Sequence, residues 1–385
     1  MQTFCERFKK LPFTGQLLSF FALFSEGLLS LLHFNRRCAT MTERSYEYVQ
    51  SKYAKYICGE EPWPENCDAI RKSFGYVLPA VNNIAKHFDS CKTMQQLTDY
   101  CDYYFKKCGD CGEKCTHPSG KCSGSCADCL KEIQYHRSDG RTEYDCKNML
   151  RYYTCHTIWK RCSEIMYALE TLDLKKYPRF NILSIGCGAA PDLMAFNKIA
   201  DGKKTSYHGI DIVTTWKDIH DFIIRKTDNT DINFERRDIY KLLDEVNAVK
   251  SLHNNYNVLV LQYMIAGHIH SNRAENISFL FDEIIDKLII KKPKDSPFLL
   301  VINDIDHKSW ICDYFNLFTK KLRGRGFRFT YNKRHFTPHE DGNNAGSKIH
   351  SSRANKFTSL ISEEHRDKYN AQAPCSAAQL IVEVL

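Results

Sequence analysis

The stretch Phe180–Ile212, FNILSIGCGAAPDLMAFNKIADGKKTSYHGIDI, decides the fold of this chain of 385 residues. It opens with an apolar run at 181–185, which is typical of a buried parallel strand. A turn of small residues follows at 186–190, and Pro191 then suits the first position of a helix, where its missing N–H costs nothing. A second apolar run ends in Asp211. This order predicts a nucleoside-binding α/β domain, because small residues let a ligand approach the backbone and the acid can accept ribose hydroxyls.

The segment SIGCGAAPDL followed by YHGIDI resembles motifs I and II of class I S-adenosylmethionine-dependent methyltransferases. The resemblance covers roughly residues 177–385. It departs from the family at Ser184, where many members carry an acid, and at Ala190, which replaces a third glycine. It implies an α/β fold with a doubly wound, Rossmann-like sheet of seven strands, and S-adenosylmethionine as the cofactor. The implied cofactor-binding residues are Ser184, Gly186, Cys187, Gly188, Asp192, Asp211, Ile212, Asp238, Ile239 and Gln262. A dinucleotide-binding dehydrogenase is the structural alternative, although its G-x-G-x-x-G spacing is imperfect here.

Polar residues that follow later apolar runs are the expected substrate-side residues. The run at 256–265 ends in Gln-Tyr-Met-Ile, whereas family members that methylate nucleic-acid amino groups carry Asn/Asp-Pro-Pro-aromatic there. This difference argues against adenine-N6 or cytosine-N4 methylation by the usual route. Ligands of such sheets bind at the carboxyl ends of strands, so Tyr263, Asn303, Asp304 and Asp306 are the catalytic candidates, with loop capping as the alternative role.

Clustered cysteines are the second strong signal. Six of the 18 cysteines lie within CGDCGEKCTHPSGKCSGSCADC at 108–129, and their short spacers allow thiolates to share one tetrahedral ion. The predicted zinc ligands are Cys108, Cys111, Cys115, Cys122, Cys126 and Cys129. Six thiolates exceed the four ligands of one zinc, which leaves open a second ion with ligands from elsewhere, idle cysteines, disulfides or an iron–sulfur cluster. Cysteine pairs of this kind favour a reducing, cytoplasmic compartment.

The expected organisation has five parts. They are a hydrophobic leader at 1–40, a helical N-terminal region at 41–104, a Cys-rich zinc-binding insert at 105–135, connecting helices at 136–176 and a class I methyltransferase-like domain at 177–385. The leader gives no confident membrane span, because Gln16 and Glu26 interrupt it. A dispensable segment, a packed amphipathic helix and a membrane anchor therefore stay open.

Two functions fit these features. The first is an S-adenosylmethionine-dependent methyltransferase that acts on a macromolecular acceptor, either nucleic acid or protein. The Cys-rich module and the basic segment 333–353 would contact that acceptor or a protein partner, and the net charge of +8 permits a polyanion. The alternative is a catalytically silent cofactor-binding and zinc interaction module within a larger complex.

Overall fold

The computed structural model describes most of the second half of the chain and parts of the first. The described residues are 93–106, 125–135, 144–200, 203–227, 230–244, 256–270, 274–290, 292, 296–305, 310–337, 347–357, 360–371 and 375–385. All of them fall within one compact unit, residues 86–385. The predicted leader at 1–40 lies outside the described residues. No helix in the described part of the chain is both long enough and apolar enough to cross a membrane.

A single mixed sheet forms the centre of the fold, and its strands follow the order β3-β2-β1-β4-β5-β8-β6-β7. Strands β1 to β5 are parallel, and β8 lies between β5 and β6, antiparallel to both. Their bounds are β1 Phe180–Ile185, β2 Thr205–Asp211, β3 Thr230–Arg236, β4 Val258–Gln262, β5 Phe298–Ile305, β6 Phe329–Thr337, β7 Ser347–His350 and β8 Ala377–Val384. The predicted Rossmann-like sheet is confirmed.

The predicted number of strands was wrong, since the sheet has eight strands and not seven. The additional strand is β7, with the sequence SKIH, which pairs in parallel with the end of β6 at the sheet edge. Most of its residues are exposed, so backbone hydrogen bonds rather than apolar side chains hold it in place. A strand of this kind lacks the apolar alternation by which strands are recognised in a sequence.

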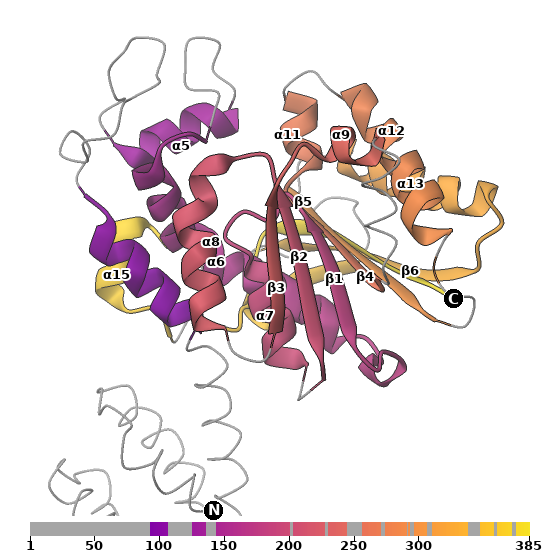
Figure 1. Cartoon of the computed structure of the whole chain (residues 1–385), viewed down its shortest axis with the longest axis horizontal. Coiled ribbons are helices and arrows are strands. Elements are labelled where there is room, and N and C mark those ends of the chain that lie inside the picture. The colour runs from indigo at the N-terminus through magenta and orange to yellow at the C-terminus, as the bar shows by residue number, and fades with distance from the viewer. Residues whose placement is uncertain are drawn as a thin grey trace, which may run out of the picture. The chain divides into compact units, whose positions relative to one another are not determined.

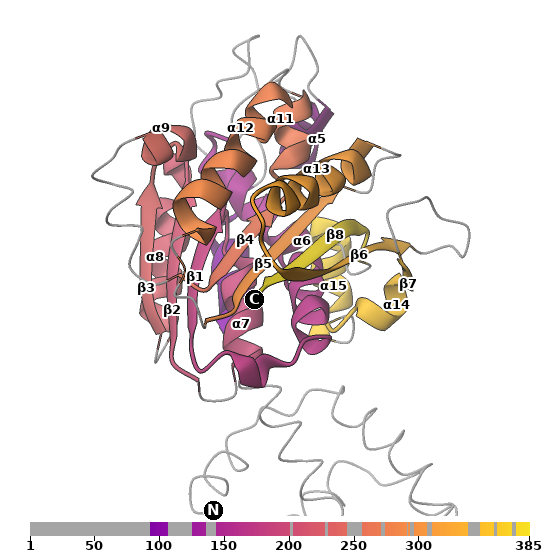
Figure 2. The same cartoon turned by 90° about the vertical axis from the view of Figure 1, so that its right-hand side faces the viewer.

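Helices cover both faces of the sheet (Figure 1). Helices α6, α7 and α8 lie on one face, and α9, α11, α12 and α13 lie on the other, as a second view also shows (Figure 2). The bounds are α5 Cys126–Tyr135, α6 Lys147–Glu170, η3 Leu174–Lys176, α7 Pro191–Ile199, η4 Thr214–Trp216, α8 Lys217–Lys226, α9 Ile239–Asp244, α11 Ile265–His270, α12 Ala274–Ile284, the π-helix η5 Ile285–Ile289, α13 Trp310–Gly324, α14 Ser351–Ala354 and α15 Glu363–Tyr369. Residues 93–104 form a further helix.

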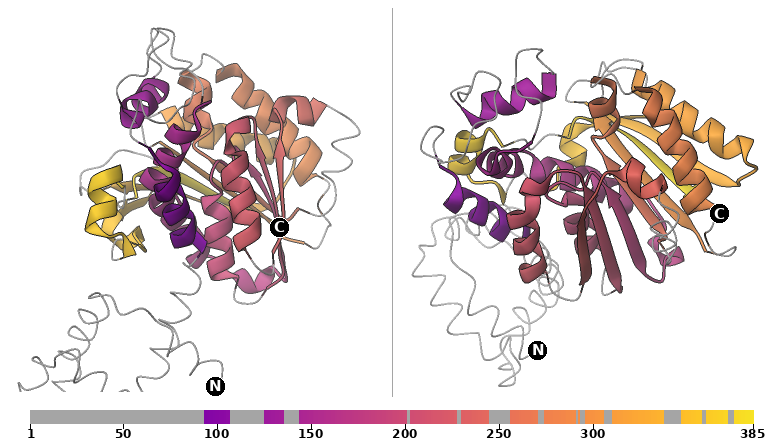
Figure 3. Two further views of the ribbon diagram at one scale, coloured as in Figure 1. Left: turned by 60° about the vertical axis from the view of Figure 1, so that its left-hand side comes forward. Right: turned by 45° about the horizontal axis from the view of Figure 1, so that its top comes forward.

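Helix α6 is built into the core of the sheet domain. Most of its 24 residues are buried, and its apolar side chains share one hydrophobic cluster with β1, α7 and α8. Figure 3 shows α6 passing behind the strands and beside α8. The predicted domain boundary at 176/177 stays a prediction, but the segment before it supplies one covering layer of the sheet.

Candidate functional site: a glycine bend at the strand tips

The bend between β1 and α7 has an unusual backbone. Gly186, Gly188 and Ala190 all have positive φ values, of 68°, 51° and 53°. Glycine adopts this conformation without the clash that a Cβ causes, whereas Ala190 pays a steric penalty that the surrounding structure must offset. The N–H groups of Gly186 and Cys187 both donate to the carbonyl of Ile210 at the end of β2, at 2.8 and 3.1 Å. The bend is therefore fixed to the neighbouring strand.

Asp211 lies directly beside this bend, as the sequence predicted. Its Oδ2 accepts the N–H of Gly188 at 2.9 Å, and its Oδ1 accepts the N–H of Val213 at 2.9 Å. Each carboxylate oxygen has more than one lone pair, so these bonds leave acceptor capacity for a ligand. Burial raises the pKa of Asp211, although the backbone hydrogen bonds oppose this shift.

His220 on α8 supports the bend from the other side. Its Nε2 lies 2.7 Å from the carbonyl oxygen of Gly188, so the Nε2–H donates to that oxygen. Its ring stacks on Phe234 with the centroids 3.9 Å apart and the planes nearly parallel at 5°. Burial lowers the pKa of His220 to about 4, which keeps the ring neutral near pH 7. Gly209 makes room for this packing, because a Cβ there would lie 2.9 Å from the Cys187 sulfur.

Asp192 lies beneath the bend. It is fully buried in the first turn of α7, and its Oδ1 accepts a hydrogen bond from the hydroxyl of Tyr207 at 3.1 Å. Ser184 on β1 also hydrogen-bonds to it, whereas its Oδ2 has no partner among the described residues. Burial raises the pKa of Asp192 to about 6. The structure thus joins two predicted cofactor residues, Ser184 and Asp192, in one buried network.

The predicted residues after β2 and β3 differ in environment. Ile212 directly follows Asp211 and is 60% exposed, which is unusual for a large apolar side chain and suits contact with a ligand ring. Asp238 accepts the N–H of Tyr240 at 2.9 Å, so it caps the short helix α9. Ile239 is buried in the core on the other face of the sheet. A cap role for Asp238 does not exclude ligand contact, but it accounts for one of its oxygens.

The tip of β4 approaches the bend closely. Gln262 is buried, and its side-chain amide donates to the backbone carbonyl of Arg161 at 3.4 Å. Tyr263 has a positive φ of 58°, and its N–H donates to the carbonyl of Asn303. Met264 lies against Gly186, because a Cβ on that glycine would be 2.8 Å from the Met264 Cγ. The Met264 side chain therefore covers the first glycine of the bend.

One polar turn of α6 faces these strand tips. The hydroxyl of Tyr263 donates to Glu164 Oε2 at 2.8 Å, and the N–H of Ser376 donates to Glu164 Oε1 at 3.2 Å. The guanidinium of Arg161 lies 4.3 Å from the ring centre of Tyr263 and 4.7 Å from that of Tyr153. Among the described residues, no carboxylate lies within ion-pair distance of Arg161. The Arg161 guanidinium instead donates to the Tyr153 hydroxyl, so this cation beside the strand tips has no carboxylate partner in the described part of the chain.

The two described polar residues after β5 have structural partners. Asn303 is fully buried, and its Oδ1 accepts a hydrogen bond from Gln379 at 2.6 Å. Asp304 is also fully buried and accepts the first N–H groups of α11, from Ile265 at 2.7 Å and Ala266 at 3.2 Å. Burial raises its pKa to about 7. Asp304 therefore caps α11, Asn303 is held by the neighbouring strand β8, and Asp306 lies outside the described residues.

Only two of the six predicted zinc ligands, Cys126 and Cys129, lie in the described part of the chain. Both are buried on α5 and pack against α6 near Cys146. The described residues contain no group of three His, Cys, Asp or Glu side chains arranged to hold a metal ion. The other four predicted ligands, Cys108, Cys111, Cys115 and Cys122, lie outside the described residues.

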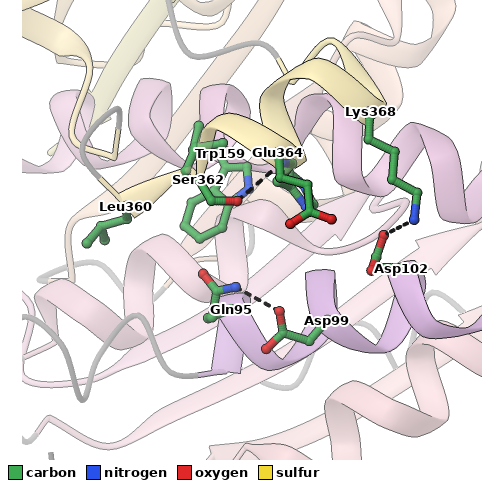
Figure 4. A pocket seen from close by; sticks show the side chains of 10 residues that line it. Gln95, Asp99, Asp102, Trp159, Leu360, Ser362, Glu364 and Lys368 are labelled. Atoms are coloured by element: carbon green, nitrogen blue, oxygen red, sulfur yellow. Dashed lines mark hydrogen bonds and ion pairs between the residues drawn. The ribbon is translucent and has the colours of Figure 1, made fainter. Parts of the chain in front are cut away.

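A separate cavity of about 220 Å³ lies between the helix at 93–104, α6 and α15 (Figure 4). Two of its acidic residues have partners within the lining, since Asp102 pairs with Lys368 at 2.7 Å and Asp99 accepts from Gln95 at 2.8 Å. None of the residues that line it belongs to the bend or to the strand tips.

Four functional candidates were not found in the sequence, namely Arg161, Glu164, His220 and Met264. Three of them lie on helices or turns far in sequence from the residues that they contact, so no motif spacing identifies them. Met264 follows a recognised strand, but nothing in the sequence indicates that it folds back onto Gly186.

Comparisons with known proteins find likeness only at the level of structure. No protein-family model matches the chain, and no curated protein matches its sequence. The plantazolicin methyltransferase BpumL in complex with SAH is 15% identical, with 66% of this chain and 94% of that chain covered and a TM-score of 0.37. The METTL16 MTase domain is 10% identical, with 57% and 65% covered and a TM-score of 0.32. The cyclopropane synthase MmaA2 from Mycobacterium tuberculosis is 13% identical, with 58% and 83% covered and a TM-score of 0.33. At these scores the likeness carries no argument about function, which has to come from the site itself.

Proposed function

We propose that this chain is a methyltransferase that binds S-adenosylmethionine at the Gly186–Gly188 bend. The observation that carries the proposal is the hydrogen bond from the Gly188 N–H to Asp211, which places an acid that can accept ribose hydroxyls next to the glycine bend. The bend also lies where β1 separates β2 from β4, which is the switch point at which ligands bind in open α/β sheets.

The residues around the bend fit the parts of this cofactor. Asp211 has lone pairs for the ribose hydroxyls, and the exposed side chain of Ile212 offers an apolar surface for the adenine. Arg161 is suited to the carboxylate of the methionine part, because it has no carboxylate partner among the described residues. Bound S-adenosylmethionine supplies a methyl group that its sulfonium already activates.

The acceptor side of the site is assigned to Tyr263. Its hydroxyl donates to Glu164, which leaves a lone pair of its oxygen for the hydrogen of an acceptor N–H or O–H. The cofactor would supply the methyl group by cleavage of its sulfur–methyl bond and leave as the neutral thioether; the proton that the acceptor atom loses would pass to Tyr263 Oη, while the Tyr263 proton would pass to Glu164 Oε2. Burial and the Glu164 carboxylate raise the pKa of Tyr263, so the phenol keeps its proton before reaction.

Binding of S-adenosylhomocysteine, the product that the cofactor becomes, tests whether the bend is a cofactor site. Calorimetric titration of the full chain with S-adenosylhomocysteine is expected to show one site, and Asp211→Ala is expected to weaken binding at least tenfold. The matched control is Asp231→Ala, which replaces an exposed acid at the other end of the neighbouring strand β3. Absence of binding by the folded wild-type chain contradicts the proposal.

A catalytically silent cofactor-binding module is the second candidate, because Gln262-Tyr263-Met264-Ile265 stands at the tip of β4 in place of an Asn/Asp-Pro-Pro-aromatic sequence. The thioether rests on Gly186, so a ligand that contacts this glycine must displace the side chain. Methionine is flexible, which makes such displacement inexpensive. Transfer of labelled methyl groups to cell-extract fractions, treated separately with nuclease and protease, distinguishes the two candidates. Labelling that disappears with one treatment also identifies a macromolecular acceptor as nucleic acid or protein.

We also propose zinc as a ligand of the cysteine-rich segment. Cys126 and Cys129 are three residues apart on α5, so both thiols lie on one face of that helix, next to the start of α6. Short Cys-x-x-Cys spacers suit tetrahedral coordination by thiolates. Elemental analysis of the purified chain tests the proposal, and a folded protein without zinc or iron would refute it.

A further inference from the structure

The basic residues near the end of α13 divide into two groups. On the side that faces α12 and η5, Lys321 pairs with Asp282 at 2.6 Å, and Arg325 pairs with both Asp282 and Asp286 at 2.8 and 2.5 Å. Lys320 and Arg323 are exposed instead, and neither has a carboxylate within ion-pair distance among the described residues. The first group stabilises helix packing, and the second has no such role.

Strand β6 places an aromatic row beside the unpaired cations. Phe329, Tyr331 and Lys333 alternate along the strand and therefore share one face. The guanidinium of Arg323 lies 5.6 Å from the ring centre of Phe329 and 5.5 Å from that of Tyr331, which is 43% exposed. The ammonium of Lys333 lies 5.9 Å from the Tyr331 ring. The exposed Tyr331 ring is therefore in contact with two cations, Arg323 and Lys333, which is an uncommon arrangement at a protein surface.

These residues, with the exposed and unpaired Arg328, form what we name the aromatic-basic surface: Lys320, Arg323, Arg328, Phe329, Tyr331 and Lys333. Figure 2 shows α13 and β6 at the end of the sheet that lies away from β3. The nearest acid on β8, Glu383, pairs with Lys176 and Tyr177 instead. The surface thus keeps an excess of positive charge.

The surface differs from the basic segment at 333–353 that the sequence suggested. Arg334 is only 3% exposed and His335 is fully buried, so neither is available at the surface. Arg334 donates to the hydroxyl of Thr171 at 3.0 Å. Burial at the end of β6 therefore removes part of the basic run from the surface, and folding adds Lys320 and Arg323 from α13.

We propose that the aromatic-basic surface binds single-stranded nucleic acid, with Tyr331 stacking on a base and the cations contacting phosphates. Unpaired cations supply the sequence-independent attraction, and an exposed ring supplies a stacking platform that a double helix cannot use. This inference deepens the proposed function, on which it rests, because it names nucleic acid as the acceptor class. Strands β4, β5 and β8 lie between β6 and β1, which separates the surface from the bend by about 20 Å across the sheet, so only a polymeric acceptor reaches both places.

Fluorescence anisotropy with labelled oligouridylate, oligothymidylate and duplex probes of about 12 nucleotides tests the proposal on the full chain. Single strands are expected to bind more tightly than the duplex. Tyr331→Ala and Arg323→Ala are each expected to weaken binding at least fivefold, and Arg323→Ala should reduce the salt dependence by about one phosphate contact. A difference between the RNA and DNA probes shows which of the two the surface prefers.

Arg225→Ala is the matched control, since Arg225 is also exposed and unpaired in the last turn of a helix but lies on α8, beside β3. It should bind the probes as the wild type does.

Equal binding by the wild type and both surface variants overturns the proposal, as does equal competition by polyglutamate, which would indicate an acidic protein partner. Titration of the wild-type chain with S-adenosylhomocysteine separates the two proposals: a wild type that binds the cofactor product but not the probes refutes only the surface, whereas a wild type that binds no cofactor product refutes the proposed function.

Discussion

At the scale of single residues, the site depends on how a few side chains fill the space around the bend. Asp211 and His220 hold Gly188 from two sides, through its N–H and its carbonyl oxygen. Met264 occupies the surface of Gly186. The backbone groups that a nucleoside would contact are therefore shaped by side chains from three different strands and helices.

Replacement of Met264 tests whether its side chain competes with the cofactor. We expect Met264→Ala to bind S-adenosylhomocysteine about three- to tenfold more tightly, because the cost of displacing a partly buried thioether, about 1 kcal/mol, is removed. Calorimetry measures this change directly. Met264→Leu keeps the volume and is the control, with affinity close to that of the wild type. Weaker binding by Met264→Ala would mean that Met264 contacts the ligand instead of blocking it.

Asp192 gives a prediction about pH. Its pKa in the folded chain is raised to about 6 by burial, above the ordinary value of 3.8, so the folded state binds the proton more tightly than the unfolded state. The resulting stabilisation is present below about pH 4 and is lost as the pH rises through about 6. Relative to the wild type, Asp192→Asn should therefore gain roughly 2–3 kcal/mol of unfolding free energy between pH 4 and pH 8.

Urea unfolding across this pH range measures that difference. The exposed carboxylate of Asp231 provides the control, through Asp231→Asn. A difference between Asp192→Asn and the wild type that stays constant with pH would contradict a raised pKa. The prediction concerns only the change with pH, because the new amide also introduces a buried N–H group whose cost does not depend on pH.

At the scale of elements, α6 joins the carboxyl ends of the parallel strands to the rest of the fold. His156, Lys160 and Glu164 lie one turn apart, so one stripe of this buried helix is polar. His156 contacts the carbonyl of Tyr369 at 2.9 Å, and Glu164 contacts Tyr263 and Ser376. Helix α6 therefore has two roles. It covers one face of the sheet, and the hydrogen bonds of its polar stripe fix the positions of the residues that they contact.

Tyr263→Phe tests the link between α6 and β4. Loss of the hydroxyl leaves one oxygen of the fully buried Glu164 without its donor, which should destabilise the fold by about 1–3 kcal/mol. Glu164→Gln keeps an acceptor for the Tyr263 hydroxyl and should cost less. Denaturant unfolding measures stability, and labelled methyl transfer measures activity, which both variants should reduce if the proton relay operates. Tyr263→Phe with unchanged methyl transfer would remove Tyr263 from the acceptor side.

At the scale of the whole molecule, the described part of the chain folds around two cores on opposite faces of one sheet. One core combines α5, α6, α7 and α8 with β1, and the other combines α9, α11, α12 and α13 with β4 and β5. Each core contains side chains from helices and strands that are far apart in the sequence. We therefore expect the sheet and its helical layers to unfold together.

A fragment that begins at residue 177 tests this expectation. Without α6 it exposes the apolar face of β1 and α7, so we expect residues 177–385 to melt without a cooperative transition. Residues 86–385 should melt cooperatively, with far-UV and near-UV circular dichroism changing at the same temperature. A cooperative transition of the shorter fragment would support the boundary at 176/177 as a true domain boundary.

The sequence by itself determined the parts of this protein that depend on local order along the chain. Phe180–Asp211 predicted β1, the glycine bend, α7 and β2, because apolar runs, small residues and a helix-starting proline each act over a few neighbouring residues. It also placed Asp211 beside the bend, since parallel neighbouring strands bring their carboxyl ends together.

Only the tertiary structure decided which distant side chains complete the site. Arg161 and Glu164 meet Tyr263 across about 100 positions of sequence, and no periodicity encodes such a contact. The sequence also did not predict β7, because this strand forms by backbone pairing and has no apolar pattern. Nor did it predict that Arg334 is buried while Tyr331 is exposed on the same strand. Burial and long-range packing are properties of the folded chain, so the sequence determined where the site begins and the fold determined what surrounds it.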